Sequence, residues 1–293
     1  MDSVGRWVIP LAQAADGEES LIGGKAAKLA RLQRAGFAVP NGFCITTLAY
    51  ERFVADTGIA KYVAMELGRK PLESMRWEEI WDAALRIRSE FLRADVPPSL
   101  SEQIARALAE LAAAGPVAVR SSAPGEDSAN FSFAGVHESV VGVDGQAALL
   151  DAVRLVWASL WSDAALLYRR ELALDPLRSR MAVLVQRMEV RDCSGVAFGR
   201  DPRDPDLDCA VIEAVPGQCA LLVDGSVDPD RWTVKRSSGE LVEWRPGNRG
   251  AGEAPEPLLN RQDLDRLLEA LTGVEALFGF PPDVEWTGRS AAL

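Results

Sequence analysis

The hydrophobic pattern of this chain changes near residue 181, and this change constrains the fold more than any other feature. Before that point, long segments carry apolar residues at helical spacing, with short strand-like runs between them. From residue 181 onward, short apolar runs such as Ala182–Met188 and Cys209–Val215 dominate, separated by turn residues. One further helix is expected at about Asn260–Phe278. We therefore predict an α+β protein with two lobes, residues 1–180 and 181–293, and a ligand cleft between them.

The composition narrows the possible partners. The chain has 293 residues, 48% of them hydrophobic, which is enough for a large core and favours two lobes over one domain. It carries 32 basic and 43 acidic side chains, a formal net charge of −11, which disfavours a nucleic-acid or anionic-membrane surface. No apolar run reaches the roughly 18 residues that a membrane span requires. We expect no nucleic-acid partner and no membrane.

Cysteine and histidine usage disfavours a structural metal site. The four cysteines are scattered without a C-x-x-C pair, and the chain has one histidine. Zinc sites need clustered thiolates and imidazoles, so a zinc site is not expected. The N-terminal stretch has no sustained apolar segment of the kind that a secretory signal carries. These features predict a soluble, reduced, cytoplasmic protein.

A Gly-Gly-Lys sequence opens an amphipathic helix at Leu21–Ala35 (LIGGKAAKLARLQRA). Lys25 lies in the first turn of that helix, where backbone N–H groups and the helix dipole favour an anion. Its ammonium group would add a full positive charge. An ordinary solvated lysine is the alternative interpretation of this motif in isolation.

The segment Val119–Glu138 (VRSSAPGEDSANFSFAGVHE) places an arginine at the end of an apolar strand and follows it with small residues. The guanidinium of Arg120 would present a rigid fork of donors that suits phosphate oxygens. The small residues after it allow backbone N–H groups to close over the same anion. A plain connecting linker is the alternative.

Two carboxylates stand close together near the end of the chain. On a strand, Asp283 and Glu285 would point to the same face, because residues i and i+2 share a face. Paired carboxylate oxygens suit Mg²⁺, whose other ligands would be water and phosphate. Two exposed carboxylates on a strand are the alternative. Gln186 to Met188 end another strand, where free backbone groups could meet a purine edge.

A lysine, an arginine, a glycine-rich loop and a carboxylate pair are the groups that phosphoryl transfer requires. The Walker A pattern and the H-R-D and D-F-G sequences of protein kinases do not occur in the chain. The common NTPase and protein-kinase frameworks are therefore excluded.

Several blocks of the sequence, in order, carry a family resemblance. The blocks are LIGGKAAKLARLQRAGFAVPNGFCIT, VAVRSSAPGEDSANFSFAGVHESVVGV, VLVQRM, SGVAFGRDP, LVDGSVDPDRW and PDVEW. Together they resemble the ATP-binding N-terminal domain of the phosphoenolpyruvate synthase, pyruvate phosphate dikinase and rifampicin phosphotransferase family. The resemblance covers nearly the whole chain, and it implies an ATP-grasp fold that holds ATP and Mg²⁺ between two lobes.

The resemblance also implies roles for single residues. Lys25 and Arg120 would contact the phosphates and act in catalysis. The loop that contains Ser132, Ala134 and Gly135 would cover the phosphates.

On the other side of the nucleotide, the resemblance implies that Gln186 and Met188 meet the adenine and that Glu213 meets the ribose. Asp283 and Glu285 match the acidic D-x-E pair of the family, with Glu285 the preferred metal ligand.

The chain departs from the family pattern in three places. Relatives read G-L-G-E where this chain has Gly217-Gln218-Cys219-Ala220, so Ala220 replaces a glutamate. Relatives continue after D-x-E-W into an L-Q-x-R-P strand that faces the nucleotide, whereas this sequence stops at Leu293. Two explanations stay open: the chain was cut, or it is natively short and binds ATP weakly.

The third departure concerns histidine. Family members transfer phosphoryl groups through a histidine on a separate swivelling domain, in a T/S-x-x-S-H setting. The histidine here, His137, lies in the predicted phosphate loop and lacks that motif. We interpret it as a loop histidine near the site rather than as a phosphate acceptor. Its imidazole could titrate near neutral pH.

The resulting hypothesis is an ATP-dependent phosphotransferase of the dikinase type that supplies the nucleotide half of the full enzyme. It would bind Mg-ATP and pass phosphoryl groups to a histidine on a domain or subunit absent from this chain, forming AMP. A split enzyme of the phenylphosphate synthase kind, with separate ATP and histidine subunits, would explain an isolated domain of this length. The alternatives are a non-catalytic ATP-binding sensor or regulatory subunit with the same fold, and a scaffold that binds no nucleotide.

Overall fold

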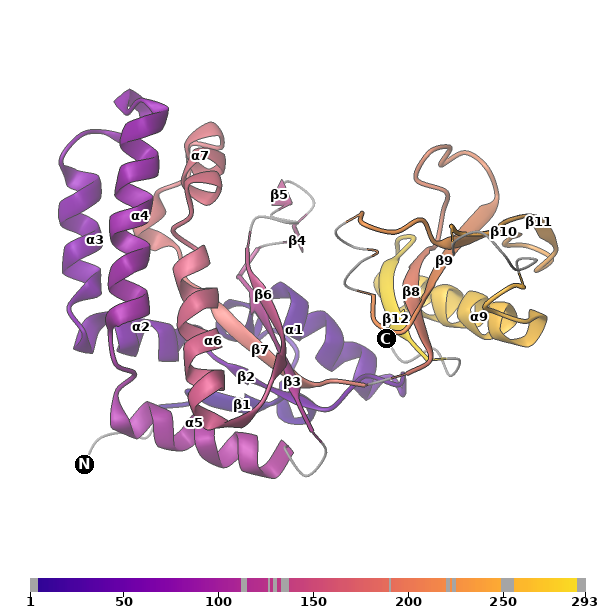
Figure 1. Cartoon of the computed structure of the whole chain (residues 1–293), viewed down its shortest axis with the longest axis horizontal. Helices are drawn as coiled ribbons and strands as arrows, with labels where there is room; N and C mark the ends of the chain where they lie inside the picture. The colour runs from indigo at the N-terminus through magenta and orange to yellow at the C-terminus, as the bar shows by residue number, and fades with distance from the viewer. Residues whose placement is uncertain are drawn as a thin grey trace. The chain divides into compact units, whose positions relative to one another are not determined.

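The computed structural model describes residues 5–111, 115–125, 127–128, 131–132, 137–189, 191–219, 222, 225–248 and 256–288. The chain divides into two compact units (Figure 1). The first combines Met1–Arg34 with Asn41–Met188, and the second combines Ala35–Pro40 with Glu189–Leu293. No helix among the described residues is long and apolar enough to cross a membrane.

The first unit is built on a five-stranded sheet in which every paired neighbour is antiparallel. The strand order is β1-β2-β7-β3-β6, so strands far apart in the sequence lie side by side. A separate two-stranded ribbon, β4-β5, follows β3 in the chain. The strands are β1 (Val8–Pro10), β2 (Gly42–Ile45), β3 (Val117–Ser122), β4 (Asp127–Ser128), β5 (Phe131–Ser132), β6 (Ser139–Val143) and β7 (Ala182–Arg187).

Helices make up most of the remaining first unit, as the apolar spacing in its sequence predicts. The α-helices are α1 (Glu19–Arg34), α2 (Thr47–Asp56), α3 (Ile59–Gly68), α4 (Trp77–Arg93), α5 (Pro98–Leu111), α6 (Gly145–Ser159) and α7 (Asp163–Glu171). Short 3₁₀ turns are η1 (Leu11–Gln13), η2 (Leu72–Ser74) and η3 (Pro176–Arg178).

One local prediction is wrong. The S-x-x-E sequence from Ser99 to Glu102 suggests a capping box, but α5 already begins at Pro98. The N–H groups of Leu100 and Ser101 donate to the carbonyl of Pro97. Proline has a preset φ and no N–H to lose, so it suits the first helical position and moves Ser99 inside the first turn.

The core of the first unit is centred on tryptophan. Trp157 on α6 is fully buried, and its Nε1 donates to the carbonyl of Met181 at 3.2 Å. Its ring lies 4.8 Å, centroid to centroid, from that of Phe53. Trp161 is 3% exposed and donates to the hydroxyl of Tyr50 at 3.0 Å. The one-turn spacing of the two tryptophans on an apolar segment predicts core packing, and these contacts confirm it, each ring having its polar atom satisfied.

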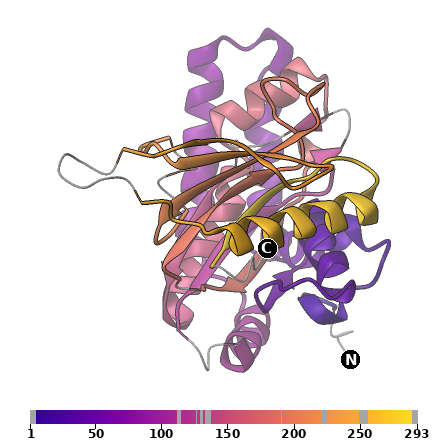
Figure 2. The same cartoon turned by 90° about the vertical axis from the view of Figure 1, so that its right-hand side faces the viewer.

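The second unit is a five-stranded antiparallel sheet of order β11-β10-β9-β8-β12 with α9 packed against β8 and β9 (Figure 1 and Figure 2). The helix begins after Asn260, which forms a capping box with Asp263, and ends at Gly279 in the left-handed conformation. The turn residues Ser237-Ser238-Gly239 predict a hairpin between two short strands, and β10 and β11 confirm it. The elements are β8 (Cys193–Phe198), β9 (Cys209–Pro216), β10 (Asp230–Lys235), β11 (Leu241–Arg245), α9 (Arg261–Phe278) and β12 (Asp283–Thr287).

The mixture of helices and sheets bears out the α+β prediction. The predicted boundary between residues 180 and 181 separates the segments expected to bind different parts of the nucleotide. It stays a prediction. Strand β7, which follows that boundary, pairs with β2 and β3 in the sheet of the first unit. The adenine-side strand of the hypothesis therefore belongs to the same sheet as Arg120.

Candidate functional site

The Gly-Gly-Lys turn is docked on the end of strand β3. Gly23 interrupts α1 with a φ of 79° and a ψ of 166°, so the regular helix restarts just before Lys25. A Cβ at Gly23 would lie 1.8 Å from the carbonyl oxygen of Ser122. The N–H of Gly24 donates to the carbonyl of Ala123 at 3.1 Å. Glycine is required at position 23 for both conformation and space.

The hydroxyl of Ser122 locks this turn in place. Its Oγ accepts a hydrogen bond from the N–H of Ala26 at 3.0 Å and donates to the carbonyl of Ile22 at 2.8 Å. The two bonds bridge the break in α1 and satisfy backbone groups that the kink would otherwise leave without a hydrogen bond. Lys25, between these anchored residues, is thus held in the first turn after the kink at the end of β3.

Arg120 lies on the same face of the sheet as Ser122, because the two residues are two apart on β3. At about 3.3 Å per residue, their Cα atoms are roughly 7 Å apart. The ladder places Ser139, an exposed residue on β6, directly opposite Arg120. The structure therefore brings Lys25, Arg120 and the hydroxyl-bearing Ser139 to one end of β3. Sequence reasoning did not single out Ser139, because its relation to Arg120 is a cross-strand register.

Gln186 shares this sheet face. It pairs with Ala118 on one side and Gly42 on the other, and it is 7% exposed. Since Arg120 pairs with Leu184, Gln186 and Arg120 are diagonal neighbours, with Cα atoms roughly 7–8 Å apart.

Met188 follows Gln186 just beyond the strand. Its N–H donates to the carbonyl of Pro116 at 3.0 Å, and its Sδ accepts from the N–H of Gly142 at 2.9 Å. The described backbone of Ser132 pairs with that of Asp127 in the β4-β5 ribbon. Ala134, Gly135 and Ala220 lie outside the described residues.

His137 lies in a cationic environment. The pKa of its imidazole is lowered to about 4, chiefly by burial and in smaller part by the positive charges of Arg169 on α7 and Lys25 on α1. A polar contact with the backbone of Ser159 opposes the shift in part. The titration of His137 is displaced from neutral pH toward acid.

Arg169 is a buried cation that the sequence did not reveal. It is 3% exposed, and its Nη1 donates to the carbonyl of Leu160 at 2.6 Å. Burial lowers its pKa to about 10, an effect that the hydroxyl of Tyr50 partly offsets. Helical spacing places Arg169 on the buried side of α7 with Ala165 and Leu166, and this spacing was the available signal.

The candidate residues of the second unit share the sheet face opposite α9. Cross-strand pairing aligns Glu285 on β12 with Val196 on β8, and Val196 with Glu213 on β9. Paired residues project to the same face, so this face carries both carboxylates. The other face carries Trp232 and Ile212, which are buried. Leu267 of α9, the helix packed against this sheet, is buried too.

An arginine on β10 fixes the carboxylate of Glu213. Arg231 stands opposite Glu213 in the ladder, and its Nη1 donates to Glu213 Oε1 at 2.9 Å. Its Nη2 is 3.4 Å from Asp201 Oδ1. All three side chains are less than one-fifth exposed, so solvent screens this cluster less than a surface pair. Arg231 was not among the predicted site residues.

Asp283 and Glu285 are exposed and lie on one face of β12, as the i and i+2 spacing predicts. Partial burial raises the pKa of the Asp283 carboxyl, and the charge of Glu285 raises it further. The charge of Glu285 therefore destabilises the ionised form of Asp283, a condition that a divalent cation relieves. Among the described residues, no group of three or more histidine, cysteine or acidic side chains is arranged as a metal site. The pair fits Mg²⁺, which needs only one or two carboxylates when phosphate supplies other ligands.

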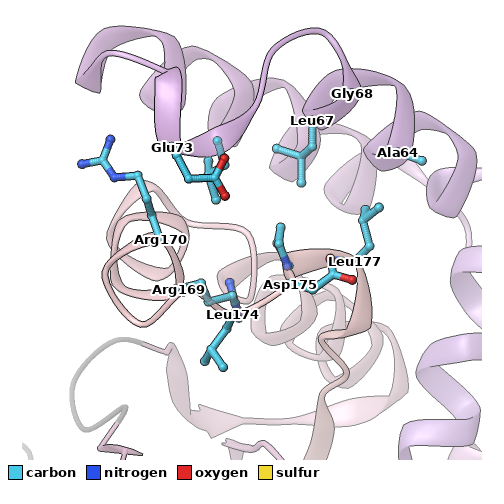
Figure 3. A pocket seen from close by; sticks show the side chains of 12 residues that line it. Ala64, Leu67, Gly68, Glu73, Arg169, Arg170, Leu174, Asp175 and Leu177 are labelled. Atoms are coloured by element: carbon cyan, nitrogen blue, oxygen red, sulfur yellow. The ribbon is translucent and has the colours of Figure 1, made fainter.

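A pocket of about 370 Å³ lies elsewhere in the first unit, between the α3–η2 segment and the α7–η3 segment (Figure 3). Leu67 and Leu177 point toward one another from its opposite walls. Arg169 lines it, but none of the predicted nucleotide-site residues does. The candidate site is therefore defined by the sheet faces and not by this pocket.

These features define an α+β protein with a Gly-Gly-Lys helix start, an arginine-bearing strand and a paired-carboxylate strand. The chain belongs to the pyruvate phosphate dikinase AMP/ATP-binding domain family, whose model matches residues 19–292. The mixed architecture is consistent with the ATP-grasp-like domain of that family.

Individual relatives agree with this assignment. The chain is 38% identical to a phosphoenolpyruvate synthase of Aeropyrum pernix over 90% of its own length and 34% of the relative. It is 35% identical to a rifampicin phosphotransferase of Streptomyces sviceus over 96% of its length and 34% of the relative. A rifampicin phosphotransferase of Bacillus subtilis is 29% identical over 91% of the chain. The chain spans about a third of the length of these relatives.

Proposed function

We propose that this chain is the Mg-ATP-binding module of a dikinase-type phosphotransferase and that it passes phosphoryl groups from ATP to a histidine on a separate domain or subunit, with formation of AMP. The observation that carries the proposal is the placement of Lys25 and Arg120 at one end of β3, through the contacts of Ser122 with the Gly-Gly-Lys turn. The family match and the names of the relatives support the reaction class.

In this proposal, the first unit binds the phosphates and the adenine. The guanidinium of Arg120 donates to phosphate oxygens in a fixed fork, while the ammonium of Lys25 neutralises charge as a point cation. Ser139, opposite Arg120, adds a hydroxyl donor on the same sheet face. The phosphate loop contributes Ser132, Ala134 and Gly135. The adenine meets Gln186, near the end of β7, and Met188, just beyond it.

The second unit supplies the ribose and metal groups. Glu213, oriented by Arg231, accepts from the ribose hydroxyls. Glu285 holds Mg²⁺ with help from Asp283. The chemistry that Mg²⁺ would supply there is positive charge that offsets the negative charge of the phosphates during transfer. Both units would thus contribute to an ATP-grasp type of nucleotide site.

The reaction gains chiefly from position and charge. Phosphoryl transfer requires little covalent chemistry from the protein, so groups held rigidly around the phosphates lower the barrier. The backbone around Lys25 is held by the hydrogen bonds of Gly24 and Ala26, and that of Arg120 by the β3 ladder, so neither needs to move when the charge on the transferred group changes.

The test is binding of Mg-ATP measured by isothermal titration calorimetry and thermal shift. We expect Arg120→Met to weaken binding about 10- to 100-fold, the effect of losing a charge-assisted hydrogen bond of roughly 1.5–3 kcal/mol. Glu285→Gln should weaken binding in Mg²⁺ more than in its absence. Arg106→Met, on the exposed face of α5, is the matched control for a lost arginine. Unchanged affinity in Arg120→Met would contradict the proposal.

The rival candidate is a non-catalytic nucleotide sensor, favoured by Ala220 at a position where relatives carry glutamate. A sensor and an enzyme both bind ATP, so binding does not separate them. AMP formation in the presence of a phosphohistidine-carrying domain does. ATP binding with no AMP formation under those conditions would favour the sensor.

A further inference from the structure

Helix α4 of the first unit carries apolar side chains on two sides. It stands beside α3 and α6 (Figure 1), and its inward side is fully buried in the core at Ile80, Ile87 and Phe91. A second row of apolar residues, at intervals of four, four and seven, is between 44% and 55% exposed and comprises Trp77, Trp81, Leu85 and Leu92. A surface helix normally carries one apolar stripe, so this second one, the α4 stripe, marks a surface for interaction.

A groove of about 630 Å³ opens beside the C-terminal end of the α4 stripe. Its apolar walls come from α4, β6 and α6 and comprise Leu92, Val140, Val141, Val143, Ala152 and Leu155. Arg154 of α6 fixes the end of α4 at this groove, because its Nη1 donates to the carbonyl of Leu92 at 2.9 Å. The groove, here called the Leu92 groove, is suited to a large apolar side chain.

The α4 stripe and the Leu92 groove complement each other across a two-fold axis. Trp77, the most exposed residue of the stripe, lies roughly 22 Å along the helix from Leu92, at 1.5 Å per residue. When two copies of α4 pack antiparallel with Leu85 at the axis, Trp77 of each copy lies at the Leu92 groove of the other. A two-fold interface requires this reciprocity, and an indole in an apolar recess is a common anchor of such interfaces.

The charges that border the stripe favour the same orientation. Glu78 and Asp82 lie in the N-terminal half of α4, and Arg88 and Arg93 lie in its C-terminal half. In the antiparallel packing, Glu78 of one copy approaches Arg93 of the other, and Asp82 approaches Arg88. A parallel packing would place like charges beside each other, which is unfavourable.

The exposed apolar area is of the size that an interface core needs. A buried aromatic side chain covers about 150–250 Å², so the half-exposed rings of Trp77 and Trp81 together leave roughly that area in water. Leu85, Leu92 and the groove walls extend it to the few hundred Å² that mark an interaction site. The bordering charges then form the polar rim of an interface that approaches the standard size of about 800 Å² per partner.

We propose that the α4 stripe is a self-association surface, across which two copies of this chain pair antiparallel about a two-fold axis, with Trp77 of each copy in the Leu92 groove of the other. The occupant is a second copy, because one surface supplies both the protruding ring and its recess, and because its charges complement themselves in this orientation. None of the predicted nucleotide-binding residues lies in the stripe or lines the groove, so this inference does not depend on the proposed function.

Sedimentation velocity of the full chain, from about 1 μM to several hundred micromolar, tests the proposal. We expect a reversible monomer–dimer equilibrium. Trp77→Ser should weaken it about 30-fold or more, the loss typical of an aromatic anchor. Phe280→Ser is the matched control, because Phe280 is an aromatic residue of the second unit that is 52% exposed, and it should leave the equilibrium unchanged. Thermal melts of both variants establish that they are folded.

A charge exchange tests the orientation. Glu78→Arg and Arg93→Glu should each weaken the dimer several-fold, up to about tenfold, because each places like charges together at two symmetry-related positions. Mixing the two variants should restore association, because every introduced charge then meets its opposite across the interface. The effect should shrink at high salt.

The outcomes decide between occupants. A chain that stays monomeric over the whole range would overturn the proposal, as would a dimer that Trp77→Ser leaves intact or a mixture of the charge variants that associates no better than either alone. If the chain is monomeric and the stripe becomes protected only when a histidine-carrying domain is added, the surface belongs to that partner and not to a second copy. Mg-ATP affinity of the dilute chain should be unchanged in Trp77→Ser, which keeps this test separate from that of the proposed function.

Discussion

Lys25 and Arg120 in the first unit are placed by different means from Glu213 and Glu285 in the second. In the first unit, a kinked helix start is held on a strand end by backbone contacts and by the Ser122 hydroxyl. In the second unit, strand register aligns the charged groups across neighbouring strands, and an arginine pairs with the carboxylates. The first arrangement depends on single close contacts, and the second on a repeating ladder. We therefore expect the first to be more sensitive to small changes in shape.

The largest effect is expected for Gly23→Ala. The added Cβ meets the Ser122 carbonyl at 1.8 Å, and the positive φ strains any L-residue, so we expect a loss of about 3 kcal/mol or more and loss of Mg-ATP binding. Gly17→Ala is the matched control, since Gly17 has a φ of 84° and open space around its Cβ position. The control should cost only about 1–2 kcal/mol. If chemical denaturation shows the same loss of unfolding free energy for Gly23→Ala and Gly17→Ala, the contact with β3 is not the reason that position 23 requires glycine.

Ser122→Ala should come next. It leaves the N–H of Ala26 and the carbonyl of Ile22 buried without their partner, which costs roughly 1–3 kcal/mol. Because Lys25 lies between these two groups, Mg-ATP affinity should fall as well. Ser121→Ala, which removes a buried hydroxyl from the opposite face of the same strand, should leave affinity unchanged. Parallel urea denaturation and calorimetry on both variants check the expectation, and equal affinities would contradict it.

A smaller effect is expected in the second unit for Arg231→Met. The substitution leaves Glu213 and Asp201 without their shared counter-charge, and we expect a loss of about 1–2 kcal/mol that shrinks at high salt. Arg245→Met is a fitting control, because Arg245 stands opposite Arg231 but pairs with Glu243 at the solvent-exposed surface. It should leave the free energy of unfolding nearly unchanged, because solvent screens an exposed ion pair. A salt-independent loss in Arg231→Met would point to packing instead.

Asp283→Asn is expected to have the smallest effect on stability. Unlike the other substitutions, it should stabilise the free protein. The folded-state pKa of Asp283 is raised, so the native state binds more protons than the unfolded state between the unfolded and folded pKa values. The free energy of unfolding therefore falls as pH rises through that acidic window, and the cost is fully present at neutral pH. Removing the charge should stabilise the free protein by less than about 1 kcal/mol, because solvent screens the exposed pair.

The same variant should weaken Mg²⁺-dependent ATP binding, since one of two oxygen ligands loses its charge. Asp206→Asn, in an exposed loop, makes the same change in net charge and serves as the control. The comparison needs thermal melts of the free proteins at pH 4 and pH 7, with calorimetry at pH 7. A destabilised Asp283→Asn at pH 7 would refute the assigned repulsion with Glu285.

Much of the local structure follows from the sequence. The helix after Gly-Gly-Lys, the strand before Arg120 and the D-x-E strand are all present, because periodicity and turn residues act over a few neighbours. The start of α5 was misjudged, since a proline at the first helical position outweighed the S-x-x-E signal. Arg169 and Arg231 were missed, because charged residues on a helix or strand usually face solvent.

The sequence alone determined the family, the α+β class and the kinds of charged group available to bind a nucleotide, since these depend on residue identity and short-range spacing. Tertiary structure decided how those groups meet. Ser122 reaches across 100 positions of sequence to hold the helix start, and the β3–β6 register brings Ser139 opposite Arg120. Burial and two cations, supplied by separate helices, displaced the titration of His137 from neutral pH. Such contacts join residues far apart in the chain, where spacing carries no information about distance.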